Sequence, residues 1–136
     1  MIHLKKEDYF RILHHACSCL PEEACGLLAG HCEGDSAWVE KVYLLENVDH
    51  SPKHFSISPE EQLSAILDMR DRELELLGNW HSHPETPSRP SAEDIRLALD
   101  PSASYMILSL AESEPVLRSF RIQSGKAEKE ELRFEE

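Results

Sequence analysis

Apolar residues recur at three- and four-residue steps in two parts of the chain, which is the spacing of one face of a helix. The first pattern begins near Lys6 and stops before Pro21, a residue that cannot continue a helix. In the second pattern Ser58 is a typical N-cap, Pro59 suits the first helical position and Glu61 completes a capping box. The predicted helices are Lys6–Cys19, Ser58–Arg70 and a shorter one over Ser91–Leu99.

Runs of apolar, β-branched and aromatic residues between these helices predict the strands of a sheet. The turn Glu33-Gly34-Asp35 joins the first two runs into a hairpin, and we expect the fifth and sixth runs to be antiparallel neighbours. Three prolines make Pro84–Pro90 a loop. The predicted strands are Cys25–Ala29, Trp38–Leu45, His54–Ser58, Glu73–His81, Tyr105–Leu110, Val116–Ile122 and Ala127–Phe134. This mixed order of helices and strands indicates an α/β fold with three layers around a mixed sheet.

Length and composition narrow the class of protein further. The 136 residues fit one compact domain, and 40% apolar with 29% charged residues is the balance of a globular chain. A net charge of −12 repels phosphate backbones and anionic lipids, so we expect no nucleic-acid partner and no membrane partner. No apolar run approaches the ~20 residues that span a bilayer, and the first residues do not resemble a signal peptide. We therefore expect a cytoplasmic protein.

Four cysteines lie in the first third of the chain. In a cytoplasmic protein the simplest expectation for them is reduced thiols. A structural zinc site is the alternative, but the spacings lack the paired Cys-x₂-Cys signature, and the first two thiols would leave a helix on different sides. The four are Cys17, Cys19, Cys25 and Cys32.

The segment from His81 to Asp94 contains the residues most suited to metal chemistry. His81 and His83 lie two residues apart where a strand ends, so their side chains leave the same face of extended backbone. Two near histidines are more often ordinary surface or core residues than ligands. Here, however, a proline-rich loop returns the chain and offers Asp94 as a third ligand. Two imidazoles and a carboxylate with water at an open position form a catalytic type of zinc site.

Two further side chains could serve such a site. Ser91 is either the N-cap of the following helix, with Asp94 as its partner, or a hydroxyl aimed at an oxyanion. The two roles coexist only in part, because one Asp94 oxygen cannot serve both the zinc ion and the capping bond. A hydrolytic site also needs a general base. Glu22 and Glu23 both precede a strand, and spacing alone does not choose between them.

These residues together resemble the JAMM (MPN-type) zinc metalloproteases. That family has an upstream glutamate, then His-x-His-Pro, a seven-residue gap and Ser-x-x-Asp. Here His81-Ser82-His83-Pro84 is followed by Ser91-Ala92-Glu93-Asp94, with seven residues between His83 and Ser91. Glu23-Ala24-Cys25-Gly26 is similar to the family's segment around its catalytic glutamate, and this similarity selects Glu23. Further segments that resemble the compact bacterial branch are Ser51–Phe55, Glu61–Leu63 and Leu117–Ile122.

The resemblance implies a single cytidine-deaminase-like α/β/α domain of the JAMM/MPN type over residues 1–136. It implies that His81, His83 and Asp94 bind Zn²⁺, that Glu23 is the general base for a zinc-bound water, and that Ser91 helps to hold the oxyanion. The implied substrate is an amide or isopeptide bond after the C-terminal Gly-Gly of a ubiquitin-like protein. Within the bacterial branch, the chain is similar to peptidases that free cysteine from a sulfur-carrier protein.

Two other functions remain to be weighed against this one. Related domains that have lost ligands act as non-enzymatic scaffolds for ubiquitin-like partners, but this chain keeps all the implied site residues. A nucleobase deaminase shares the implied fold, and His83-Pro84-Glu85 has its His-x-Glu form; however, no Pro-Cys-x-x-Cys follows. For the peptidase, we expect an extended substrate tail to add a strand at an exposed sheet edge beside the metal.

Overall fold

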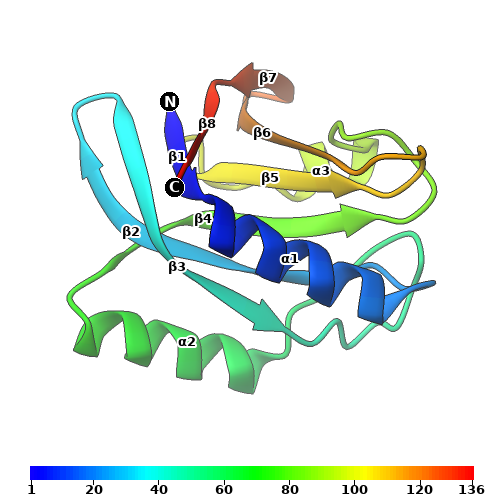
Figure 1. Ribbon diagram of the computed structural model, residues 1–136, viewed down its shortest axis with the longest axis horizontal. Helices are drawn as coiled ribbons and strands as arrows, with labels where there is room; N and C mark the ends of the chain where they lie inside the picture. The colour runs from blue at the N-terminus through cyan, green and yellow to red at the C-terminus, as the bar shows by residue number, and fades with distance from the viewer.

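The computed structural model describes residues 1–136 and contains one eight-stranded sheet in the order β7-β6-β5-β4-β2-β3-β1-β8 (Figure 1). The hairpin of β2 and β3 and the antiparallel pair of β5 and β6 are confirmed, whereas β4 and β5 run parallel and are connected through a helix. The sheet is therefore mixed. Its strands are β1 (Ile2–Lys5), β2 (Cys25–Glu33), β3 (Ser36–Leu45), β4 (Glu75–His83), β5 (Ser104–Ser109), β6 (Val116–Gln123), β7 (Lys126–Glu130) and β8 (Leu132–Glu135).

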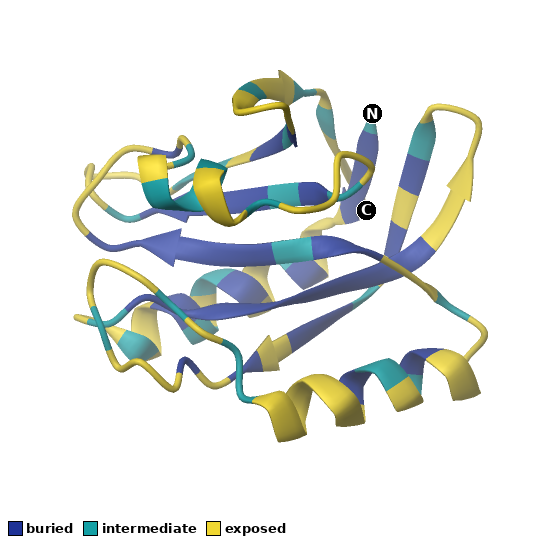
Figure 2. Cartoon of the chain, turned by 180° about the vertical axis from the view of Figure 1, so that it is seen from behind, coloured by how far each residue is buried: buried dark blue, intermediate teal, exposed yellow.

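Helices cover both faces of this sheet. Helix α1 (Lys6–Cys19) lies on one face, and α2 (Pro59–Asp71) and the short α3 (Ala92–Leu97) lie on the other (Figure 1; Figure 2). Neighbouring side chains of β2 point to opposite faces of the sheet, because side chains alternate along a strand. Leu28 belongs to the core cluster under α1, and Leu27 to the cluster under α2. The predicted three-layer α/β architecture is confirmed.

The middle of the sheet packs closely around Trp80 of β4, which is fully buried. Its Nε1–H donates a hydrogen bond to the carbonyl oxygen of Tyr43, at 3.1 Å. Residue 26 on the neighbouring strand must be glycine, because a Cβ on Gly26 would lie 1.8 Å from that same oxygen. With Trp80 fixed on the α1 face, the alternation along β4 sends His81 and His83 to the opposite face.

Strands β1 and β8, which lie beside each other at one edge of the sheet, differ from the prediction. Strand β1 was not predicted, because four residues are too few to show a period, yet Ile2 and Leu4 are fully buried. The predicted strand Ala127–Phe134 is wrong, since it forms two strands. Strand β7 pairs with β6, and β8 pairs in parallel with β1 at the opposite edge of the sheet. The segment divides into two strands because its two halves pair with strands that lie far apart in sequence, β6 and β1.

Two details around α2 also differ from the prediction. His54–Ser58 is not a strand, since only an isolated bridge joins Asn47 to Ile57. The capping box of α2 is half formed. The N–H of Glu61 donates to the N-cap hydroxyl at 3.4 Å, but its carboxylate accepts instead from the N–H of Glu46, at 2.6 Å. The carboxylate therefore connects the helix start to the end of β3.

The ends of two elements near the loop after β4 are shifted from their predicted places. Helix α3 ends at Leu97 instead of near Leu99, and β4 continues to His83 instead of ending at His81. The second histidine is therefore still part of the strand. None of the helices combines the length and the apolar character needed to cross a bilayer.

Candidate metal centre

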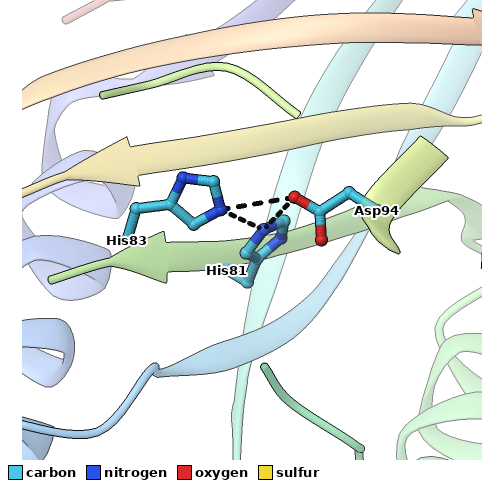
Figure 3. Close-up of side chains that lie close together, drawn as sticks. All are labelled: His81, His83 and Asp94. Atoms are coloured by element: carbon cyan, nitrogen blue, oxygen red, sulfur yellow. Dashed lines mark hydrogen bonds and ion pairs between the residues drawn. The ribbon is translucent and has the colours of Figure 1, made fainter. Parts of the chain in front are cut away.

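The three side chains expected to bind metal converge on one point (Figure 3). The Nε2 atoms of His81 and His83 are 3.0 Å apart, and Oδ2 of Asp94 lies 3.2 Å and 3.3 Å from them. Both imidazoles are buried, and the carboxylate is partly exposed. No other group of three or more His, Cys, Asp or Glu side chains comes together in this way. The site joins the end of β4 to the first turn of α3.

The proline-rich loop between β4 and α3 is held against the sheet by hydroxyl groups. The hydroxyl of Ser88 donates to the carbonyl oxygen of Ile107, and that of Ser109 donates to the carbonyl oxygen of Thr86, each at 2.7 Å. The carbonyl of Ser88 also accepts from Arg118 at 3.4 Å. These bonds anchor the loop to β5 and β6, so the chain returns with α3 facing the two histidines.

The donor chemistry of the cluster fits a divalent cation. Nδ1 of His83 lies 3.0 Å from the carbonyl oxygen of Pro87, which can only accept, so Nδ1 carries the proton and Nε2 of the neutral ring presents a lone pair. That lone pair faces Nε2 of His81 and the carboxylate of Asp94. Three electron-rich atoms so close together repel one another unless a proton or a cation lies among them. A carbonyl that fixes the tautomer of a ligand histidine is a common feature of metal sites.

The protonation of the three groups is coupled. Burial raises the pKa of Asp94, but its close contacts with the rings of His81 and His83 and the N–H of Ser91 outweigh burial and hold the pKa of this carboxyl well below its usual range. Burial lowers the pKa of His81 and favours its neutral form. Burial also disfavours charge on His83, but its contacts with Asp94 and Pro87 outweigh burial and raise its pKa. Asp94 is thus ionised in this site.

The backbone before β2 places Glu23 beside the same cluster. In the antiparallel pairing of β2 and β4, Cys25 lies opposite His81, so Glu23 falls level with His83. The N–H of Ala24 donates to the hydroxyl of Ser82 at 2.8 Å, and the N–H of Ser82 donates to the carbonyl of Ala24 at 3.0 Å. Ser82, the residue between the two histidines, therefore joins the glutamate segment to β4.

The side chain of Glu23 differs from that of its neighbour. Glu23 is buried, and burial raises its pKa to about 8, an effect that His83 opposes and Asp94 reinforces. Glu22 is half-buried, and its carboxylate lies 3.1 Å from Nδ1 of His50. The fold thus separates two glutamates between which spacing alone could not choose.

Ser91 caps α3 and contacts the candidate ligand directly. Its Oγ accepts from the N–H of Asp94 at 3.0 Å, and Oδ2 of Asp94 accepts from the N–H of Ser91 at 2.9 Å. The same Oδ2 faces both histidines. The predicted conflict between capping and ligation does not arise from this geometry, because a carboxylate oxygen has more than one lone pair. The Ser91 hydroxyl accepts in the cap and keeps its own proton free to donate.

An aromatic side chain beside the cluster was missed by sequence reasoning. The ring of Phe55 stacks on the ring of His81, with the centroids 4.6 Å apart and the planes 25° from parallel. Phe55 comes from the loop after β3 and is half-buried. The one signal for it was its place in Ser51–Phe55, a segment that resembles the bacterial JAMM branch. Sequence spacing could not show that this segment reaches the histidines.

The cysteines do not belong to the cluster of candidate ligands. All four are free thiols, with the side chain of Cys25 buried and those of Cys17 and Cys32 exposed. Burial raises the pKa of the Cys25 thiol to about 12, which disfavours its thiolate.

Comparisons with known proteins agree with this geometry. A family model described as prokaryotic homologs of the JAB domain matches residues 5–123. The CysO-cysteine peptidase of Mycobacterium tuberculosis is 35% identical over 106 residues, which cover 77% of this chain and 71% of that protein. The match includes most of the chain.

Solved structures share the fold. A solution structure of a protein from Desulfitobacterium hafniense is 55% identical, covers 100% of this chain and 94% of that one, and has a TM-score of 0.92. The crystal structure of a JAB1/MPN domain protein from Archaeoglobus fulgidus is 23% identical, covers 99% and 98% of the two chains, and has a TM-score of 0.60. This chain therefore belongs to the compact prokaryotic branch of the JAMM/MPN family and is a hydrolase.

Proposed function

We propose that this protein is a zinc-dependent peptidase that hydrolyses the amide bond after the C-terminal Gly-Gly of a ubiquitin-like or sulfur-carrier protein. The observation that carries the proposal is the convergence of His81, His83 and Asp94 beside the buried carboxyl group of Glu23. The similarity to a CysO-cysteine peptidase supports cysteine as the amine that leaves.

We propose that His81, His83 and Asp94 hold the zinc ion. When bound, zinc supplies a Lewis acid that lowers the pKa of water and polarises a carbonyl group. Ligation by two imidazoles and one carboxylate is typical of catalytic zinc sites, because three protein ligands leave a position for water or substrate. The tautomer of His83 and the ionised state of Asp94 support this assignment.

Glu23 is the proposed general base. It would accept a proton from the attacking water and return it to the leaving amine. Its burial and its raised pKa support this role, because a carboxyl group whose pKa lies close to neutral pH can both take up and release a proton. Ser91 would then donate its free hydroxyl proton to the developing oxyanion, since its oxygen is already engaged in the helix cap.

The expected mode of tail binding needs correction. Strand β4, which ends at the candidate ligands, is paired on both sides, by β2 and by β5. The nearest unpaired edges are β3 beyond Trp38 and β6 before Ser119, each two strands from β4. A tail cannot therefore add a strand directly beside β4. We propose that it contacts the loops around the candidate ligands, including the loop that carries Phe55, where glycines would fit a narrow path.

The scaffold function is the second candidate. It would require an incomplete or dispersed set of site residues, whereas here the three candidate ligands lie within 4.8 Å of one another. Tight binding of a Gly-Gly tail without any turnover would favour it over the peptidase.

The test of the proposed function is hydrolysis of a carrier-protein–cysteine adduct by the zinc-loaded protein, followed by mass spectrometry. Glu23→Gln is expected to lower kcat by roughly 100-fold or more, the usual contribution of a general base. Glu22→Gln is the matched control and should retain activity, because its carboxylate contacts His50 at the surface.

Two substrate variants separate the parts of the proposal. An adduct whose last two glycines are changed to leucine should react slowly, and an adduct to a lysine side chain tests whether the leaving amine must be cysteine. Hydrolysis that survives Glu23→Gln would contradict the proposed mechanism. Equal rates with the Gly-Gly and Leu-Leu tails would contradict the proposed tail specificity.

A further inference from the structure

The side chain of Asn47 is buried in the loop after β3, at 6% exposure. Its Nδ2 donates to the carbonyl oxygens of Glu23 and His54, at 3.0 Å and 3.1 Å. Its Oδ1 accepts from the N–H groups of Asp49 and Ser56, at 3.0 Å and 3.1 Å. A side-chain amide has two N–H donors and two acceptor lone pairs, so all four are used. These contacts also fix which way the amide points.

Two of these bonds hold the backbone on either side of Phe55. Asn47 binds His54 and Ser56, and the ring between them stacks on His81 at 4.6 Å. A third bond holds the carbonyl of Glu23, the residue proposed as the base. One buried amide thus connects the backbone of the base to the aromatic ring that packs on a candidate metal ligand.

The remaining bonds of the Glu23 segment do not duplicate this connection. The N–H of Glu23 donates to the carbonyl of Ser51 at 2.8 Å, which joins backbone to backbone. The next residue, Ala24, is bound by Ser82 of β4. Neither bond contacts the segment beside Phe55, which is otherwise held by Val48 and Asp49 of its own loop. Loss of Asn47 therefore removes the direct link between this segment and the backbone of Glu23.

We infer that Asn47 is a positioning residue for hydrolysis, which fixes Glu23 and the Phe55–His81 pair relative to one another. This inference rests on the proposed function. A displacement of about 1 Å in a reacting group can cost on the order of 100-fold in rate. Removal of Asn47 should therefore lower kcat, because the backbone of Glu23 loses its link to the Phe55 segment and the base is misplaced. The three candidate zinc ligands, which Asn47 does not contact, should remain in place.

Two variants test the role. Asn47→Asp has almost the same shape and keeps the acceptor oxygen, but it replaces both donors by an oxygen that faces two carbonyls. Asn47→Ala removes all four bonds. For each we expect kcat to fall at least about 10-fold, KM to rise by a smaller factor than kcat falls, and bound zinc to remain at one equivalent. Rates are compared below the melting temperature of each variant.

The matched control is Met69→Ala. Met69 is buried under α2, and its truncation destabilises the fold without touching the site. It should keep kcat. If Asn47 had a purely structural role, the Asn47 variants and Met69→Ala would all lose activity only in proportion to their unfolded fraction.

The decisive measurement combines Asn47→Asp with Glu23→Gln. If Asn47 acts through Glu23, Glu23→Gln should cost less in the Asn47→Asp background than the roughly 100-fold it costs in wild type, by about the factor that Asn47→Asp has already removed, because residues that act as a unit are not additive. Amide hydrogen exchange at Ser56 gives a readout that needs no substrate. It should become faster in Asn47→Ala, in which the N–H of Ser56 loses its acceptor.

Unchanged kcat in the folded, zinc-loaded Asn47 variants would overturn the positioning role. It would also be overturned if Glu23→Gln lowered kcat by as much in the Asn47→Asp protein as in wild type. Failure of both variants to fold would assign Asn47 a purely structural role instead. If the wild type leaves the adduct intact, the proposed function fails and this inference falls with it. If wild type and Asn47 variants cleave equally, only the inference fails.

Discussion

At the scale of single residues, neighbours in sequence have opposite environments around the candidate metal centre. Ser82 is fully buried and binds Ala24, while His81 and His83 on either side face the cluster. Glu22 and Glu23 differ in the same way. A slip of one residue between β2 and β4 would exchange these environments, because side chains alternate along a strand. Burial of both faces of β2 specifies the register against such a slip.

Asp68 on α2 gives a pH prediction at this scale. Its Oδ2 accepts from Lys41 at 2.7 Å, from Tyr43 at 2.7 Å and from Arg72 at 2.9 Å, and these bonds, that of Lys41 first, lower its pKa to about 2. The unfolded chain takes up this proton near its ordinary pKa of about 3.9. Asp68 therefore stabilises the fold above about pH 4, and its contribution is lost between about pH 4 and pH 2.

Thermal melts of wild type and Asp68→Asn measure this effect. The variant should melt at a lower temperature at pH 6, and the difference should shrink toward pH 2. Asp71→Asn, an exposed neighbour on the same helix, controls for the general loss of charge. A difference that is the same at both pH values would contradict the prediction.

At the scale of elements, α3 is placed by its connections and not by its own packing. It has six residues, none of them buried, and helices this short are unstable in isolation. The capping box between Ser91 and Asp94 closes its first turn, and the hydroxyl bonds of the preceding loop hold it to β5. The candidate ligand thus sits where the helix is best fixed, in its first turn.

Strand β8 leads to a second prediction, at the scale of elements. It pairs along its whole length with β1, and the carboxylate of Glu135 lies 2.6 Å from Nδ1 of the buried His3. A variant that ends at Glu131 should lose about 1 kcal/mol for each backbone hydrogen bond removed. It should also self-associate, because β1 becomes an exposed edge strand.

Thermal melts and light scattering test the loss of β8. The matched control is a variant that ends at Glu135 and so loses only Glu136, whose exposed contact with Lys6 should contribute nothing measurable. Equal melting temperatures for the two truncations would show that β8 adds no stability.

At the scale of the whole molecule, the candidate centre joins parts of the chain that are far apart in sequence. The proposed base comes from the segment before β2, two candidate ligands from β4, the third from α3 and the stacked ring from the loop after β3. The chain has a net charge of −12, and two acidic side chains lie together at this site. A divalent cation would offset their repulsion and connect β4 to α3.

Removal of the metal tests whether a bound cation stabilises the whole folded molecule. A ligand that binds only the folded state at about 1,000 times its Kd adds about 4 kcal/mol of stability. In a domain of this size that corresponds to roughly 10 °C or more in Tm. Chelation should lower Tm by this amount and zinc should restore it. Asp94→Asn should lose the response, whereas His31→Ala, which removes an exposed partner of Glu40, should keep it. A zinc response that survives Asp94→Asn would contradict the ligand assignment.

The sequence by itself determined the elements with a strong local period or clear boundary residues, namely the three helices and most of the strands. It also singled out His81, His83 and Asp94 as candidate ligands, because a strand end, a proline-rich loop and a helix start are local features. Choosing Glu23 needed family resemblance. Short strands could not be predicted in the same way, since β1 and β8 have four residues each and are specified by each other across the whole length of the chain.

Only the tertiary structure decided which side chains meet. Packing around Trp80 and Gly26 sets the register that brings Glu23 level with His83. The buried amide of Asn47 brings Phe55 to the ring of His81. The physical reason is that sequence periodicity reports the faces of an element, whereas a site depends on pairing and burial between elements that only the folded chain brings together.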